Sequence, residues 1–135
     1  MMRMTNVLAI VLAALIQVES GGNPSAVGDG GRAVGILQQH PISVREANRI
    51  TGNRWTYADR RDPARAKAMC LATLAWHYKR GVTDPVELGG RWRNPKGDAP
   101  RWYKERVREA INRTKGSPSC LRPRRRDGRA KGFSL

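Results

Sequence analysis

The stretch Ile16-Gln17-Val18-Glu19-Ser20-Gly21-Gly22-Asn23-Pro24 decides the fold, because a long apolar run ends there at one carboxylate and a glycine pair. The preceding run, residues 7–18, is apolar on nearly every side and predicts a helix that is buried all round. Gly21 and Gly22 supply the left-handed geometry that ends such a helix. The sequence therefore predicts a buried helix with Glu19 in its last turn.

Glu19 is a candidate general acid. In the last turn of a helix the charged form of a carboxylate is disfavoured by the helix dipole, and apolar surroundings disfavour it further. Both effects raise the pKa of Glu19, and an acid that stays protonated near neutral pH can donate a proton in catalysis. The alternative is a surface glutamate at a frayed helix end, and this feature alone does not decide between the two.

A glycine-rich segment follows, from Gly28 to Pro41. It predicts a tight loop that leads into a short extended or hairpin segment. Gln38 and His40 are the polar groups in this segment that are candidates to line a cleft. Asp29 stands within Gly-Asp-Gly-Gly, which is ordinary turn chemistry.

Three pieces of this region together resemble the lysozyme-like superfamily: Glu19-Ser20-Gly21-Gly22-Asn23-Pro24, Ala33-Val34-Gly35-Ile36-Leu37-Gln38 and Pro41. The resemblance is to the soluble lytic transglycosylase and goose-type lysozyme branch, particularly its small phage and prophage forms, and it extends more weakly over residues 6–110. It implies that Glu19 is catalytic, and we expect Ser20, Gln38 and His40 to contact the substrate.

The resemblance also implies a mechanism with one carboxylate, whereas most glycosidases need two. Glu19 would protonate the oxygen between N-acetylmuramic acid and N-acetylglucosamine and then accept a proton from the muramoyl C6 hydroxyl, which closes a 1,6-anhydro ring. The nucleophile belongs to the substrate, so no second acid is required. Asp29 is the one nearby acid in the sequence that could instead activate water and make the protein a muramidase; its turn context favours a structural role.

The second half carries weaker motifs. Relatives in this branch usually have an Asn-Gly-Gly-Pro-like turn, followed by a tyrosine on the last helix that borders the acid. Tyr103 matches that tyrosine, and Asn94 is a looser match because the glycine pair is missing and the loop is shorter. We expect both side chains to bind substrate. Residues 57–60 also resemble a family segment, in which we expect a structural turn.

The remaining pattern predicts a mainly α fold. Asp-Pro pairs and glycines mark helix starts and stops, and no alternation is long enough for a substantial sheet. Four further helices are predicted, over residues 41–50, 63–80, 85–92 and 102–113. The expected architecture is a compact lysozyme-like α-rich (α+β) domain over residues 1–115, with one small β-like loop and a flexible tail over residues 116–135.

The high positive charge of the chain indicates anionic partners but does not identify which one. The chain has 135 residues, enough for one domain, and a net charge of +15, which attracts nucleic acid and the anionic bacterial wall alike. In the tail, six basic residues against Asp127 give a charge of +5, and such a segment is expected to be disordered when free. The tail is either a tether to anionic wall polymers or nucleic acid, or a solvated terminus without a role.

Metal, cofactor and disulfide chemistry are not expected. His40 and His77 lack partners at metal-binding spacing, and nothing in the spacing of Cys70 and Cys120 argues for a disulfide. Cys70 falls on an apolar helical face and is interpreted as a buried thiol. Four tryptophans, Trp55, Trp76, Trp92 and Trp102, suit either sugar stacking or core packing.

The apolar run near the start could also be a signal peptide, since Arg3 precedes it and Val11-Leu12-Ala13 resembles a cleavage site. Cleavage there would remove most of the helix that positions Glu19, and the run is too short for a transmembrane helix. We therefore interpret it as a core helix of a monomer that acts on the bacterial wall, in the periplasm, from a virion or after export.

Two other classes stay open. A basic helical protein with an arginine-rich tail can be a nucleic-acid-binding module, although no motif beyond charge supports it. A catalytically inactive, sugar-binding structural protein would keep the tryptophans and would not need Glu19. The presence of Glu19 counts against this second class.

Overall fold

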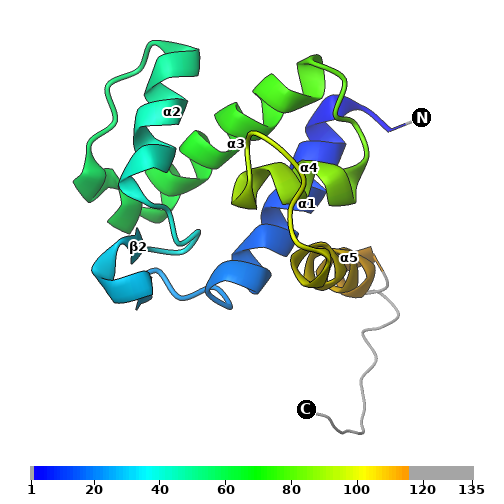
Figure 1. Ribbon diagram of the computed structural model, residues 1–135, viewed down its shortest axis with the longest axis horizontal. Helices are drawn as coiled ribbons and strands as arrows, with labels where there is room; N and C mark the ends of the chain where they lie inside the picture. The colour runs from blue at the N-terminus through cyan, green and yellow to red at the C-terminus, as the bar shows by residue number, and fades with distance from the viewer. Residues whose placement is uncertain (1, 116–135) are drawn as a thin grey trace, which may run out of the picture.

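The computed structural model describes residues 2–115, so the predictions for the basic tail, for Cys120 and for a domain boundary at residue 115 fall outside or at the edge of the described residues. The described part is mainly α, as expected, with one small hairpin (Figure 1). Its elements are α1 (Met4–Glu19), β1 (Val27–Gly28), η1 (Asp29–Gly31), β2 (Ala33–Val34), α2 (Pro41–Thr51), η2 (Tyr57–Arg61), α3 (Pro63–Lys79), α4 (Pro85–Arg93) and α5 (Arg101–Lys115). None of the helices within residues 2–115 has the length and apolarity needed to cross a membrane.

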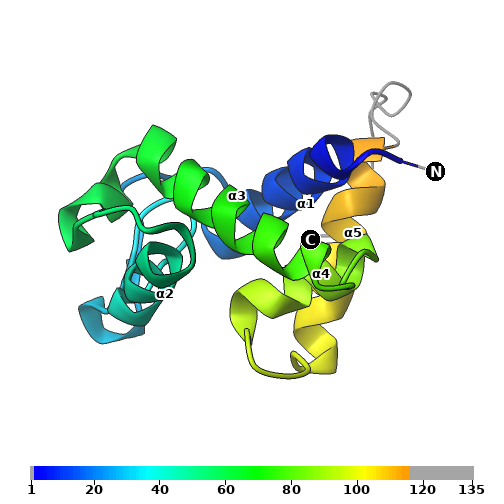
Figure 2. The same cartoon turned by 90° about the horizontal axis from the view of Figure 1, so that it is seen from above.

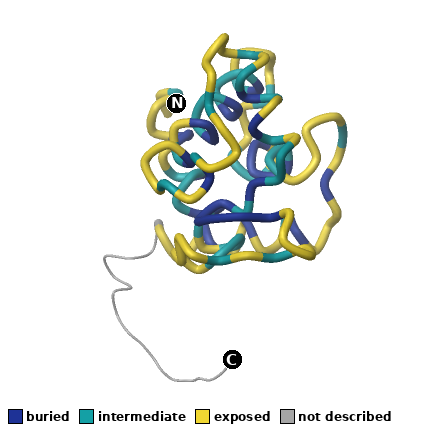
Figure 3. Tube along the Cα trace, turned by 90° about the vertical axis from the view of Figure 1, so that its left-hand side faces the viewer, coloured by how far each residue is buried: buried dark blue, intermediate teal, exposed yellow. Residues whose placement is uncertain are grey.

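The helices form two lobes that share α3. In one lobe α1 packs against α4 and α5; in the other α2 packs against η2, and α3 contacts both sets (Figures 1 and 2). The first lobe holds the main hydrophobic core, centred on α1 and α5. The second lobe has a small core of Val44, Ala47 and Met69 with Trp55 against it. Figure 3 shows the buried stretches inside and the exposed loops around them.

Helix α1 is less enclosed than its sequence predicted. Its buried residues, Val7, Leu8, Val11, Ala14 and Leu15, lie on the side covered by α3, α4 and α5. Ala9 and Gln17 are exposed, so the prediction of burial all round was wrong. The three covering helices do not close around α1, and its uncovered side meets solvent. The predicted end is confirmed, because Gly21 and Gly22 have φ of 66° and 90°.

The helix starts predicted from Asp-Pro pairs are confirmed. The Asp62 carboxylate accepts a hydrogen bond from the Ala64 N–H, and the Asp84 carboxylate accepts from two N–H groups in the first turn of α4. Pro63 and Pro85 each occupy the first helical position, where a missing N–H costs nothing.

The hairpin is held against the second lobe by η2. Strand β1 pairs antiparallel with β2, and the buried Arg60 guanidinium donates to the Arg32 carbonyl at 2.9 Å and to the Gln39 carbonyl at 3.0 Å. Gly35 has φ of 89°, and a Cβ there would stand 2.0 Å from the Arg60 carbonyl oxygen. This close approach fixes the hairpin against η2. The strand pairing confirms the predicted hairpin, and η2 confirms the predicted turn over residues 57–60.

Candidate active site

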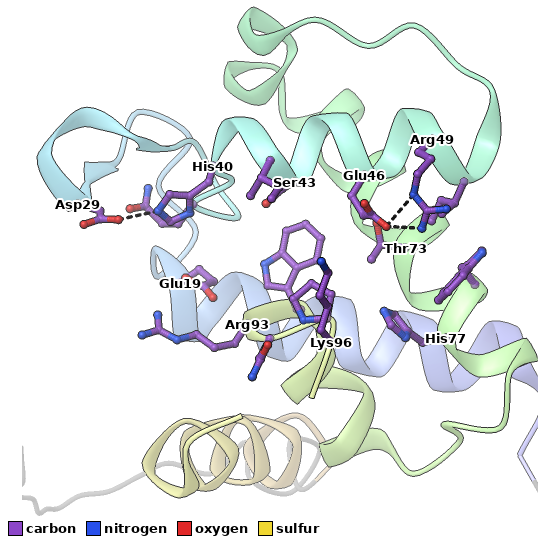
Figure 4. Close-up of a pocket in the computed structure, with 17 residues that line it drawn as sticks. Glu19, Asp29, His40, Ser43, Glu46, Arg49, Thr73, His77, Arg93 and Lys96 are labelled. Atoms are coloured by element: carbon purple, nitrogen blue, oxygen red, sulfur yellow. Dashed lines mark hydrogen bonds and ion pairs between the residues drawn. The ribbon is translucent and has the colours of Figure 1, made fainter. Parts of the chain in front are cut away.

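An open cavity of about 770 Å³ lies between the two lobes (Figure 4). Each of the helices α1 to α4, the hairpin and the loop after α4 contributes to its walls. The lining residues are Glu19, Asp29, Gln38, His40, Ile42, Ser43, Glu46, Arg49, Ile50, Thr73, Trp76, His77, Trp92, Arg93, Asn94, Pro95 and Lys96. Four of the six candidate residues therefore meet around one cavity, namely Glu19, Gln38, His40 and Asn94, and the possible second acid, Asp29, lies there too.

Glu19 is the last residue of α1 and is partly buried at the cavity wall. The Tyr103 hydroxyl donates a hydrogen bond to its Oε2 at 2.5 Å. Burial raises the pKa of Glu19 above its ordinary value, while the Tyr103 hydrogen bond and the Arg93 charge oppose that rise. The net rise lets this carboxyl carry a proton at a higher pH than an exposed glutamate does.

Tyr103 stands behind Glu19 and does not line the cavity. Its side chain is only 2% exposed, in the core between α5 and α1. Burial and the Glu19 charge raise the pKa of the Tyr103 phenol far above its ordinary value. The phenol therefore stays protonated and can only donate to Glu19 while that carboxylate is charged, which makes it a positioning group in this structure.

Ser20 is not brought to the cavity wall. Its hydroxyl donates to the Ile36 carbonyl at 2.7 Å and accepts from the Gly22 and Asn23 N–H groups, each at 3.1 Å. These contacts tie the end of α1 to the segment after β2. Ser20 therefore holds in place the backbone that follows Glu19.

Gln38 lines the cavity and also braces the hairpin. Its amide Nε2 donates to the Ala26 and Gly35 carbonyls, each at 3.0 Å. Its φ is 48°, in the left-handed region that residues other than glycine seldom adopt. Both features fix where this side chain stands in the cavity wall.

His40 and Asp29 form a pair at the hairpin end of the cavity. His40 Nε2 lies 2.7 Å from Asp29 Oδ2, and Arg32 lies 3.5 Å from the same oxygen. The hydrogen bond with His40, followed by the charge of Arg32, lowers the pKa of Asp29. An ionised carboxylate and an imidazole thus share one cavity with Glu19 (Figure 4).

Asn94 follows the end of α4 and also lines the cavity. Its side-chain amide donates to the Asp98 carbonyl at 2.9 Å, which closes the loop over residues 94–98. The shortened loop therefore still reaches the cavity, with part of its asparagine's hydrogen-bonding capacity used internally.

Several cavity residues were not singled out as site residues from the sequence. They are Ser43, Glu46 and Arg49 on α2, Thr73, Trp76 and His77 on α3, and Trp92, Arg93 and Lys96 from α4 and the loop after it. The three on α2 recur at every third position, as do Thr73 and Trp76, which is the spacing of one helical face. That signal was present in the sequence, but which face meets the cavity depends on how the lobes pack.

Trp76, which the sequence left open between sugar stacking and core packing, lines the cavity, and His77 lines it too. Arg80 covers the Trp76 ring, with its guanidinium carbon 3.7 Å from the centroid. Burial, with the charges of Arg91 and Arg80, lowers the pKa of His77. The Trp92 indole N–H donates to the Leu37 carbonyl at 3.3 Å, so this ring is anchored across the cavity wall.

Comparison with known proteins identifies one family. The family model described as Transglycosylase SLT domain matches residues 1–110 of the chain. No curated protein and no solved structure matches it. The matched range contains every candidate site residue.

Proposed function

The chain belongs to the transglycosylase SLT domain family, and from that premise we propose that it is a lytic transglycosylase with Glu19 as its only catalytic acid and base. The family is one of peptidoglycan-cleaving, lysozyme-like domains, so the substrate is the glycan of the bacterial wall. The finer statements are ours: which residue acts, and that the product carries a 1,6-anhydro ring. The narrower assignment to small phage and prophage forms stays a prediction.

In the proposed reaction, protonated Glu19 donates its proton to the glycosidic oxygen as the bond from C1 of the muramoyl residue breaks. The N-acetylglucosamine chain leaves with a free C4 hydroxyl. The Glu19 carboxylate then accepts the proton of the muramoyl C6 hydroxyl while its oxygen bonds to C1. No water is consumed, and Glu19 ends protonated as it began.

The observation that carries the proposal is the position of Glu19 between cavity and core. Its carboxyl faces a cavity large enough for sugar rings, and burial raises its pKa, as a general acid requires. The hydrogen bond from Tyr103 stabilises the carboxylate that must exist after proton donation. One group is thereby suited to both steps.

A second candidate function, muramidase activity, is favoured by one observation. Asp29 lines the same cavity, its pKa is lowered, and it contacts His40. An ionised carboxylate or its imidazole partner in the cavity that Glu19 lines can activate water, as an inverting glycosidase requires. The two functions differ in their product, because hydrolysis leaves a reducing-end muramic acid.

Mass spectrometry of the products from purified peptidoglycan separates these functions. We expect the native chain to release fragments that end in 1,6-anhydromuramic acid and Glu19→Gln to release none while keeping its helical circular dichroism. Reducing ends would establish the muramidase instead. An uncut substrate with the native chain would mean a binding or structural role.

We further propose that the catalytic domain spans residues 1–115 and that residues 116–135 act as a basic tether to anionic wall polymers. The support is the concentration of charge, since this segment carries +5 of the total +15. We propose a monomer that reaches the wall in the periplasm, from a virion or by export.

A further inference from the structure

An exposed tryptophan stands beside the Glu19–Tyr103 contact and has no part in the reaction described above. Trp102 precedes Tyr103 on α5 and is 51% exposed, in contrast to the buried tyrosine. The two rings meet edge to face, with centroids 5.7 Å apart. Tryptophan is highly buried on average, so a half-exposed indole at this place suggests a contact surface next to the acid.

Two arginines flank this tryptophan. The guanidinium carbon of Arg93, at the end of α4, lies 5.3 Å from the Trp102 centroid, and that of Arg106, one turn along α5, lies 5.9 Å from it. We call Arg93, Trp102 and Arg106 the α5 platform. Arg93 also lines the cavity and reaches toward Glu19 (Figure 4). The platform is therefore continuous with the cavity wall at the acid.

The platform carries positive charge that residues 2–115 do not neutralise by an ion pair. Two other cations of α5 are paired: Lys104 with Glu87 and Asp98, and Arg108 with Glu105. Neither Arg93 nor Arg106 has a carboxylate partner within the described chain, and the charge of each lowers the pKa of Glu19. Two guanidinium groups on an indole thus face solvent within electrostatic range of the acid.

We propose that the α5 platform binds the carboxylate-bearing peptide stem of the muramoyl residue held at Glu19. This inference rests on the proposed function, which puts a muramoyl residue there. That residue carries its stem on the lactyl group, outside the glycan chain, and stem carboxylates are the anionic groups nearest to the scissile bond. Planar guanidinium groups pair with carboxylates in a fixed geometry, and an indole face packs against peptide atoms.

The test measures binding, with Glu19→Gln as the background so that the ligand stays intact. Two ligands are compared by calorimetry at one ionic strength: muramoyl-containing saccharides with their peptide stems, and the same saccharides after an amidase has removed the stems. We expect Arg106→Gln to weaken binding of the stem-bearing ligand by up to about fivefold, the upper end of the range for an exposed charge pair. Trp102→Ala should weaken it similarly, and binding of the bare saccharide should not change.

Arg113→Gln is the matched control, since Arg113 is also exposed on α5, two turns beyond Arg106. It should alter neither affinity. Arg106→Lys keeps the charge without the planar group and should fall between the parent and Arg106→Gln. Thermal melts of each variant check that the domain stays folded.

Three results would overturn the proposal: equal losses on both ligands, no loss on either, or displacement of the stem-bearing ligand by an oligonucleotide of matched charge, which would mark a non-selective polyanion surface. Failure of the proposed function is distinguishable. In that case the native chain leaves peptidoglycan uncut, whatever the binding results for the platform variants. If the native chain cuts peptidoglycan but its binding does not depend on the stem, only the proposal for the α5 platform is rejected.

Discussion

The Tyr103 hydroxyl on α5 donates to the Glu19 carboxylate on α1 at 2.5 Å, across 84 positions of sequence. The contact is possible because α1 and α5 share the main core, in which Tyr103 is nearly fully buried. Burial and this donor act on the pKa of Glu19 in opposite directions. The packing of two helices thereby sets the proton affinity of the candidate acid.

Tyr103→Phe should raise the pKa of Glu19 further, because it removes a hydrogen bond that lowers it. A general acid must be protonated, so the high-pH limb of the kcat/KM profile should move to higher pH. The maximal rate should fall roughly tenfold, since a hydrogen bond to a charged group is lost in the second step. Tyr78→Phe, on α3, is the matched control and should leave the profile in place. If the high-pH limb of the Tyr103→Phe profile does not shift, the Tyr103 hydrogen bond does not set the pKa of the catalytic acid.

Glu19→Gln should raise the Tm of the domain above that of the native chain at pH 7. At acidic pH the two Tm values should be similar. The pKa of Glu19 is raised in the folded state from 4.5, so the folded chain binds more protons than the unfolded chain between the two values. Stability therefore falls as pH rises through that window, and a neutral glutamine removes the loss. Thermal melts at pH 4 and pH 7 measure the difference in Tm. Glu109→Gln, exposed on α5, controls for loss of one negative charge. A larger gain at pH 4 than at pH 7 would contradict the raised pKa.

Asp29→Asn should leave the anhydro product unchanged and keep most of the activity. Asp29 has φ of 51°, which asparagine also tolerates, so the turn should survive the change. Product analysis by mass spectrometry, with Asp98→Asn as a control acid from the loop after α4, measures the outcome. Loss of activity by two orders of magnitude, together with reducing-end products from the native chain, would instead make Asp29 the second acid of a muramidase.

Gly35→Ala should destabilise the domain by about 2–5 kcal/mol. This figure adds the cost of a left-handed backbone at alanine to the cost of an overpacked contact. The new Cβ would meet the Arg60 carbonyl oxygen, and neither backbone can move without breaking the hairpin contacts. Gly52→Ala is the matched control: its φ is 77°, nothing lies within 4 Å of the added Cβ, and the cost should be about 1–2 kcal/mol. Urea titrations of both variants measure the difference. Equal costs would show that the contact with Arg60 does not constrain the hairpin.

Removal of residues 117–135 should weaken retention on isolated cell walls at low salt and leave it unchanged at high salt. Charge attraction acts over about 30 Å at 0.01 M salt and about 3 Å at 1 M. A full-length chain with glutamine at the six basic tail positions is the matched control and should behave like the truncation. Sedimentation with wall sacculi measures retention. If the truncated and native chains respond to salt alike, the tail is no tether.

Much of the fold could be predicted from the sequence because its signals are local. In the Asp62-Pro63 and Asp84-Pro85 pairs, the aspartate accepts hydrogen bonds from N–H groups of the first turn next to it. The two helix starts can therefore be predicted without knowing the tertiary structure. The same holds for Gly21 and Gly22 after α1. Burial of α1 could not be predicted in the same way, because it depends on how many helices cover it.

By itself the sequence determined the candidate acid and the hairpin beside it, since Glu19 and Gln38 lie within 20 residues and their motifs act locally. Only the tertiary structure decided what surrounds them: the Tyr103 hydroxyl behind Glu19, the faces of α2 and α3 that meet the cavity, and the pairing of His40 with Asp29. Ser20 was expected at the substrate, and the structure gives its hydroxyl to the Ile36 carbonyl. The physical reason is that short-range capping and turn preferences are set by neighbouring residues, whereas burial and its effect on pKa are set by segments that meet only when the lobes pack.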